Sequence, residues 1–456
     1  MNEPRVATHR HARAKRTAVR FGFQSHTAPF IVMPGLDPRL SGSILLYKAH
    51  GIDSTPLGTF RDDPGHEESN AVPHQNTVFR DLVNRLPWGV LDRLVAEAKA
   101  DAGVRRLSTK DQLLAMMFAQ LSGARSLRDV EAVLESQASQ RYHAGMRPVR
   151  RSTLADANLK RPAGVFAGLF AAMVAQAGRH LRRTVGECVH LIDSTSMRLN
   201  QLSADWSRFS ADVCGVKAHI VYDPDAGCPV YLAITPARVN DITAAQEMPI
   251  QAGATYVFDL GYYDYGWWAK LDAADCRIIT RLKSNTPLTV IEILPVPPDS
   301  SAILSDRIGY LPERMAKNRR NPMGNPVREV RVRIETGKVL RILTNDLDAP
   351  ASEIADLYKR RWQIELFFRV MKQTLKITKF LGRSENAVRI QVAVALIAFL
   401  LLRALQDITE VRHSFLELVR LVRANLMHRK DVSRMRQNTP PPPLDSRQLK
   451  LDLAAA

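Results

Sequence analysis

The chain has 456 residues, 45% hydrophobic and 24% charged, so it can bury a large core and hold two or more domains. A formal net charge of +18 and a sequence pI near 10.0 predict a polyanionic partner. Nucleic acid is favoured over a membrane, because no lipid anchor is visible and the longest apolar run, residues 392–402, is too short to cross a bilayer. The four cysteines lack paired metal-ligand spacing and the polar N-terminus shows no signal peptide, which predicts a cytoplasmic location.

Residues 1–72 are predicted to be a basic, flexible extension, since they lack sustained hydrophobic periodicity and carry several early arginines. They could be a DNA-binding arm or an upstream extension of the reading frame without a role. Residues 73–150 are predicted to be helical, with Ser108 capping one helix, Gly123 ending it and Ser126 capping the next. Two helices around a Gly-containing turn are typical of a helix-turn-helix DNA reader and equally of an ordinary helical hairpin.

Strand patterns begin after a predicted helix at residues 165–177. One apolar run ends in Asp193, a hairpin is predicted at residues 218–234, and a second apolar run ends in Asp259. Each Asp is read as closing a buried strand, a place where carboxylates from neighbouring strands can converge. The alternative for each is an ordinary strand-terminating or helix-capping Asp. Lys217 and His219 share one face of the hairpin and could approach DNA, or could be surface or hydrogen-bonded sheet residues.

Two further regions are defined by composition. Residues 285–345 contain Pro, Gly and short β-like runs, with Tyr310 as the only aromatic residue. Between positions 313 and 341 there are nine Lys or Arg against three Glu, which predicts contacts with phosphates. Residues 406–456 are predicted to be a basic helical region that ends in a disordered, Pro-rich tail.

The segment 358–372 reads as a helix with a polar face beside an apolar stripe. At 100° per residue, the polar members fall within an arc of about 80°. They are Tyr358, Arg361, Glu365, Arg369 and Lys372. A carboxylate at the edge of a buried face, flanked by cations, suits a group that holds a metal while its neighbours grip a phosphate backbone. The alternative is an amphipathic helix with a solvated face, so Glu365 needs Asp193 and Asp259 as partners.

The spacing of this helix carries a resemblance. The insertion-sequence-four family of bacterial cut-and-paste transposases has a spaced signature. It consists of Tyr, two residues, Arg, three residues, Glu, six residues and Lys. It is met without a gap by Tyr358, Arg361, Glu365 and Lys372. Residues 191–195 and 258–262 match the family's two Asp blocks, residues 343–346 and 385–391 match its flanking segments, and the resemblance covers about residues 75–405.

The resemblance implies an α/β fold with a ribonuclease-H-like core, a mixed sheet flanked by helices, at residues 151–405. It also implies a β-rich insertion at about 285–345, a helical N-terminal DNA-binding domain at 73–150 and a helical C-terminal region. Asp193, Asp259 and Glu365 are then catalytic and hold two Mg²⁺ ions, which Mn²⁺ can replace. The residues expected to bind DNA are Tyr358, Arg361, Arg369 and Lys372.

The activity implied is cutting of double-stranded transposon ends and joining of the 3′-hydroxyls to target DNA, by a homodimer in the synaptic complex. Relatives use a Trp of the insertion during hairpin formation, and no Trp occurs between residues 285 and 345, so a hairpin step is in doubt. Two other functions stay open. One is a nuclease that cuts without joining, and the other is an inactive DNA-binding remnant.

Overall fold

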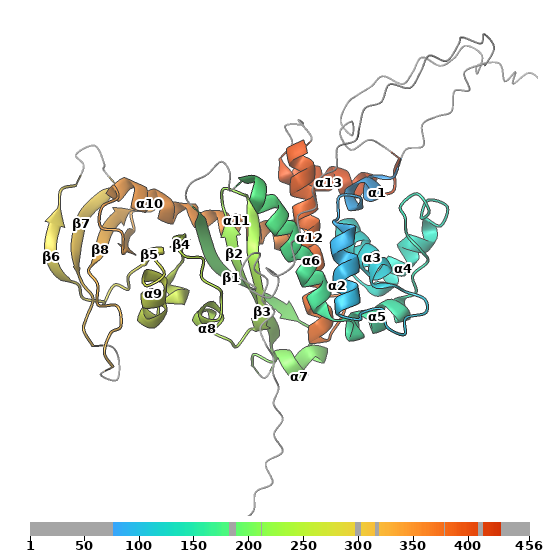
Figure 1. The fold of residues 1–456 in the computed structure, drawn as a ribbon, viewed down its shortest axis with the longest axis horizontal. Coiled ribbons are helices and arrows are strands. Elements are labelled where there is room, and N and C mark those ends of the chain that lie inside the picture. The colour runs from blue at the N-terminus through green and yellow to red at the C-terminus, as the bar shows by residue number, and fades with distance from the viewer. Residues whose placement is uncertain are drawn as a thin grey trace, which may run out of the picture.

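The computed structural model describes residues 76–181, 188–210, 212–296, 302–314, 319–377, 379–408 and 414–429. The extension predicted at residues 1–72 and the tail beyond residue 429 lie outside the described residues. Figure 1 shows a helical body at one end of the molecule and a long sheet that reaches from it to the other end.

The helical body combines segments from both ends of the described chain. Its members are α1 (Val78–Val83), α2 (Trp88–Glu97), α3 (Thr109–Ser122), α4 (Leu127–Ser136), α5 (Arg151–Lys160), α6 (Ala163–Leu181), α12 (Glu385–Ile408) and α13 (Phe415–Asn425). The predicted signals of α3 and α4 are confirmed, since Ser108 and Ser126 cap them and Gly123 ends α3 in the left-handed region at φ 77°.

Helix α12 runs through this body and packs against α3 and α6. It is long and apolar enough to cross a membrane by length and composition, yet 89% of its most apolar window is buried by the rest of the protein. Its hydropathy therefore matches its position as a core helix.

One nine-stranded sheet has the order β3-β2-β1-β4-β5-β9-β8-β7-β6. Its strands are β1 (Val189–Leu199), β2 (Cys214–Asp223), β3 (Cys228–Pro236), β4 (Thr255–Val257), β5 (Arg277–Arg281), β6 (Thr289–Leu294), β7 (Ile303–Tyr310), β8 (Val327–Arg333) and β9 (Val339–Thr344). The predicted hairpin is confirmed, because β2 and β3 pair antiparallel. β1 also pairs antiparallel with β2, whereas β4 and β5 run parallel to it. This mixed sheet is the ribonuclease-H-like core that the family resemblance implies.

Helices cover both faces of the sheet. On one face lie α8 (Asp241–Gln246) and α9 (Tyr265–Asp272), with Trp267 and Trp268 fully buried beneath. On the other face lie α6 and α12, together with α10 (Ala351–Arg360) and α11 (Trp362–Arg369). The sheet core is thus buried on both sides, and functional side chains can reach solvent only at strand ends and edges.

The region predicted as a β-rich insertion forms β6 to β9, which extend the same sheet. A buried ion pair joins β7 to β8, where Arg328 donates to both carboxylate oxygens of Asp306 at 2.8 and 2.6 Å. Glu329, fully buried, binds three arginines within 3 Å. They are Arg307, Arg331 and Arg341. Three of the cations predicted to touch phosphates, Arg328, Arg331 and Arg341, are therefore paired with carboxylates of the sheet.

Candidate active site

Asp193 and Asp259 lie at the same level of two neighbouring parallel strands. Leu191 of β1 pairs with Val257 of β4, so each Asp follows this last paired position by two residues. Neighbouring strands lie about 4.8 Å apart, which brings the two aspartates side by side. The closeness has an electrostatic consequence, because the charge of Asp259 raises the pKa of Asp193.

The prediction that Asp193 closes its strand is wrong. β1 continues to Leu199 and stays paired with β2 up to Leu199 and Cys214. What ends at Leu191 is the pairing with β4, so beyond this residue one edge of β1 no longer has β4 beside it. Asp193 is consequently a strand residue and no helix cap, and its Oδ1 accepts the N–H of Ser194 at 2.7 Å.

Asp259 does act as a cap, which was the alternative to a ligand role. It precedes the short 3-10 helix Leu260–Tyr262, and its Oδ1 accepts the N–H of Gly261 at 2.8 Å. A Cβ at Gly261 would lie 3.0 Å from Asp259 Oδ1 and 3.2 Å from Asp241 Oδ2. Glycine here lets two carboxylates approach the same backbone, and capping leaves the second oxygen of Asp259 for other partners.

Glu365 reaches the aspartates from α11, which packs against β1. Arg361 joins the two elements, because its Nη2 lies 2.6 Å from Glu365 Oε1 and its Nη1 lies 3.4 Å from Asp193 Oδ2. The three carboxylates predicted from distant parts of the chain are thus brought to one place. Within the described ranges, no three His, Cys, Asp or Glu side chains are arranged to enclose a metal ion, and Arg361 lies between Asp193 and Glu365.

The electrostatics of the site centre on Asp193. Burial is the main cause that raises its pKa to about 6, and the negative charges of Asp259 and Glu365 add to the rise. The Ser194 N–H and the Arg361 guanidinium act in the opposite direction. A cation that approaches such a carboxyl group stabilises its ionised form. Carboxyl groups with perturbed pKa values are common at functional sites.

The residues predicted to bind DNA lie on α10, at the junction of α10 with α11, on α11 and on the π-helical turn that follows it. Tyr358 is buried, and its ring centroid lies 5.9 Å from the Arg361 guanidinium carbon. Arg369 is exposed, whereas Lys372 is half-buried on a π-helical turn, Val370–Thr374, and burial lowers its pKa. The apolar stripe beside them is buried as predicted, at Leu357, Ile364, Phe368, Met371 and Leu375.

One carboxylate of this site was missed from the sequence. Asp241, the first residue of α8, accepts the Ser194 hydroxyl at 2.8 Å and the Lys217 ammonium at 3.0 Å. His219 lies 3.8 Å from it, and burial lowers the pKa of this histidine to about 4. Lys217 therefore holds a carboxylate beside Asp259, and the His219 ring lies next to that carboxylate at a distance too long for a hydrogen bond. Strand alternation placed them on one face, but no local pattern pointed to Asp241.

The comparisons with known proteins agree with one another. Residues 185–401 match the family model described as a transposase DDE domain, and residues 74–147 match one described as a domain of unknown function. The putative transposase y4zB of Sinorhizobium fredii is 39% identical over 315 residues, which cover 68% of this chain and 85% of the relative. The probable transposase for insertion sequence element IS5377 of Geobacillus stearothermophilus is 26% identical over 76% of this chain and 91% of its own.

A shorter match and a solved structure complete the comparisons. Transposase InsG for insertion sequence element IS4 of Escherichia coli is 43% identical over 53 residues, or 11% of this chain and 12% of the relative. A chain from the cryo-EM structure of the piggyBac transposase synaptic complex with hairpin DNA aligns with 82% of this chain and 84% of its own, at 10% identity and a TM-score of 0.45.

Proposed function

This chain belongs to the DDE transposases of the insertion-sequence-four type, and from that premise we propose that it cuts phosphodiesters at the ends of its insertion sequence and joins the freed 3′-hydroxyls to target DNA. One observation carries the proposal. Asp193 and Glu365, 172 positions apart, share the guanidinium of Arg361, and Asp259 follows the neighbouring strand at the same level as Asp193.

The donor set fits divalent metal. All three side chains offer carboxylate oxygens, the ligands that Mg²⁺ prefers, and burial makes the ionised form of Asp193 costly until a cation is near. Two Mg²⁺ ions, or Mn²⁺ in their place, would supply the charge that activates an attacking oxygen and stabilises a leaving one. Asp193, Asp259 and Glu365 would hold them.

The chain's own residues then have separate tasks. Gly261 holds Asp259 in one orientation through its N–H, and Asp241 holds Ser194, the neighbour of Asp193. Arg361 offers a planar fork that suits either a carboxylate or a phosphate, so it neutralises the acids before DNA binds and grips the backbone afterwards.

Further along the helix, Arg369 and Lys372 extend the positive charge toward the DNA, and Tyr358 packs beside Arg361. Joining two ends in one event requires two active sites, which we propose a homodimer supplies. An enzyme that acts on an insertion sequence works on bacterial DNA, hence in the cytoplasm.

The experiment is a strand-transfer assay on DNA that carries the inverted repeats flanking the gene, with labelled ends, target plasmid and Mg²⁺. Joined products support the proposal. Nicked ends without joined products would make the chain a nuclease, and binding without nicking would make it an inactive remnant. Glu365→Gln is the matched negative control, because it preserves the shape of the side chain and removes its charge.

A further inference from the structure

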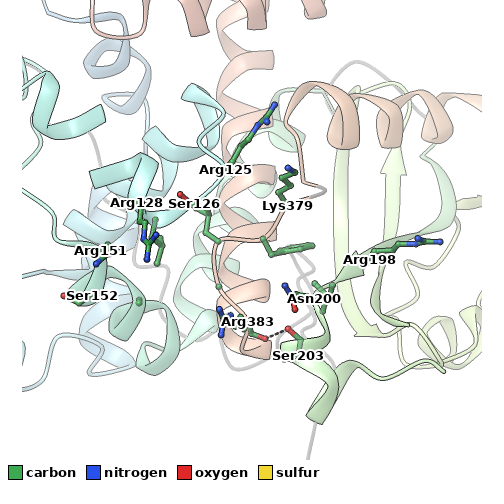
Figure 2. A pocket seen from close by; sticks show the side chains of 16 residues that line it. Arg125, Ser126, Arg128, Arg151, Ser152, Arg198, Asn200, Ser203, Lys379 and Arg383 are labelled. Carbon is green, nitrogen blue, oxygen red and sulfur yellow. Dashed lines mark hydrogen bonds between the residues drawn. The ribbon is translucent and has the colours of Figure 1, made fainter. Parts of the chain in front are cut away.

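A cleft of about 930 Å³ lies between the helical body and the first strand of the sheet. Its walls come from four separated parts of the chain: the start of α4, the start of α5, the end of β1 with the residues that follow it, and the segment 379–383. Figure 2 shows Arg125, Arg128 and Arg151 on the helical side, with Lys379 and Arg383 on the segment that faces them. The Arg198 side chain also borders the cleft but extends away from this group in the same view.

The cleft is strongly positive because no acidic residue lines it. All five cations of the two walls are exposed. Arg151 lies 3.9 Å from Glu131, and the side-chain nitrogens of the other four have no carboxylate within 4.0 Å among the described residues. Like charges gathered in one cleft repel each other, and among the described residues Glu131 beside Arg151 and Asp129 close to Arg125 offset only part of that repulsion. The expected occupant is therefore an anion with several charges.

Backbone N–H groups add to this character. α4 and α5, each of 10 residues, begin at the cleft, and their first residues line it. Ser126 caps α4, but Arg150, at the N-cap of α5, makes no side-chain cap hydrogen bond. The N-terminal N–H groups of α5 are therefore open to an external acceptor, and a phosphate is the acceptor that such helix ends favour.

The wall that carries Lys379 and Arg383 is held in place by hydrogen bonds from neighbouring elements. Gln391 of α12 accepts the Leu381 N–H at 2.8 Å and donates to the Lys379 carbonyl at 2.9 Å. The Arg383 carbonyl accepts the Ser203 hydroxyl at 2.8 Å and the Trp206 indole N–H at 3.1 Å. Four hydrogen bonds thus fix the backbone of this segment, so little backbone freedom is lost there when a ligand binds its two exposed cations.

We propose that this cleft binds the sugar-phosphate backbone of double-stranded DNA, as a contact separate from the catalytic carboxylates. The proposal rests on the proposed function, which supplies a duplex at Asp193. β1 leads from Asp193 to Leu199 at the cleft, about 20 Å for six residues at about 3.3 Å each. Phosphates follow each other about every 3.4 Å along one strand, so the cleft meets the duplex about six nucleotides from the cut.

The test is the salt dependence of DNA binding by the full chain, in EDTA so that no cutting occurs. The variant Arg128→Gln/Arg383→Gln removes one cation from each wall, and Arg93→Gln/Lys270→Gln removes two exposed cations elsewhere as the matched control. Fluorescence anisotropy of a labelled duplex is measured across a series of KCl concentrations. Each lost phosphate contact should reduce the slope of log K against log[KCl] by about 0.9, hence about 1.8 for the cleft variant.

The expected result is the smaller slope and weaker binding in the cleft variant alone, with circular dichroism and urea unfolding unchanged in both variants. An unchanged slope in the folded cleft variant, or an equal loss in the control, overturns the proposal. Glu365→Gln separates it from the proposed function, because that variant should keep the wild-type slope while it loses cutting. If the wild-type protein cuts and joins DNA but the cleft variant keeps the wild-type slope, the proposed DNA contact in the cleft is refuted and the proposed function is not.

Discussion

Replacing Asp193 by Asn is expected to stabilise the metal-free protein at neutral pH. The pKa of this carboxyl rises from 3.8 to about 6 on folding, chiefly through burial, and only 19% of the side chain is exposed. A carboxyl group with a raised pKa favours folding below its unfolded pKa, and that contribution is lost as the pH rises toward its folded pKa. At about 1.4 kcal/mol per pKa unit, ionised Asp193 lowers the free energy of unfolding by up to about 3 kcal/mol.

The assay is urea unfolding of wild type and Asp193→Asn in EDTA, from pH 4 to pH 7.5. The stability difference should be near zero around pH 4, grow between pH 4 and pH 6, and stay constant above. Asp92→Asn, on the exposed side of α2, is the control and should change stability by less than about 0.5 kcal/mol. Equal stability of wild type and Asp193→Asn at pH 7 would refute the reasoning, because Asp193 would then carry its charge without cost.

Three other substitutions test the surrounding structure. Glu329→Gln leaves three arginines around a fully buried position without their charge partner, so urea unfolding should show that the free energy of unfolding falls by about 3–5 kcal/mol. The exposed Glu335→Gln is the control, and an equally small fall in both variants would contradict this. Asp241→Asn weakens the hold on Lys217, so single-turnover cutting should slow while DNA affinity in EDTA stays at the wild-type value; unchanged cutting would remove Asp241 from the site. Arg361→Ala should weaken DNA binding and lower the salt slope by about 0.9, and a wild-type slope would show that Arg361 makes no phosphate contact.

The catalytic fold could be predicted because its signals are local. The hairpin of β2 and β3 has a turn between two apolar runs, and the buried stripe that runs from α10 through α11 repeats with helical spacing. The sequence prediction ended the strand that carries Asp193 too early, and the reason is physical. Beyond Leu191 the strand loses β4 as a neighbour and becomes half-exposed, and a loss of apolar character looks the same in sequence as the end of a strand.

The remaining features depend on contacts between distant residues. Asp241 joins the site only because α8 folds over β2, and its neighbours in sequence carry no sign of that contact. Basic residues of the insertion look available for phosphate until the register of β7 and β8 sets Arg328 against Asp306. The cleft likewise assembles from segments about 250 positions apart, such as those of Arg128 and Arg383, whose proximity no spacing rule predicts.

The central claim is that Asp193, Asp259 and Glu365 act as one metal-dependent site. It is tested most directly by cutting of labelled insertion-sequence ends in Mg²⁺, with Asp193→Asn, Asp259→Asn and Glu365→Gln measured beside the wild type. All three variants should bind the ends in EDTA with about wild-type affinity and produce no detectable nicks. Wild-type cutting by any one folded variant would contradict the claim.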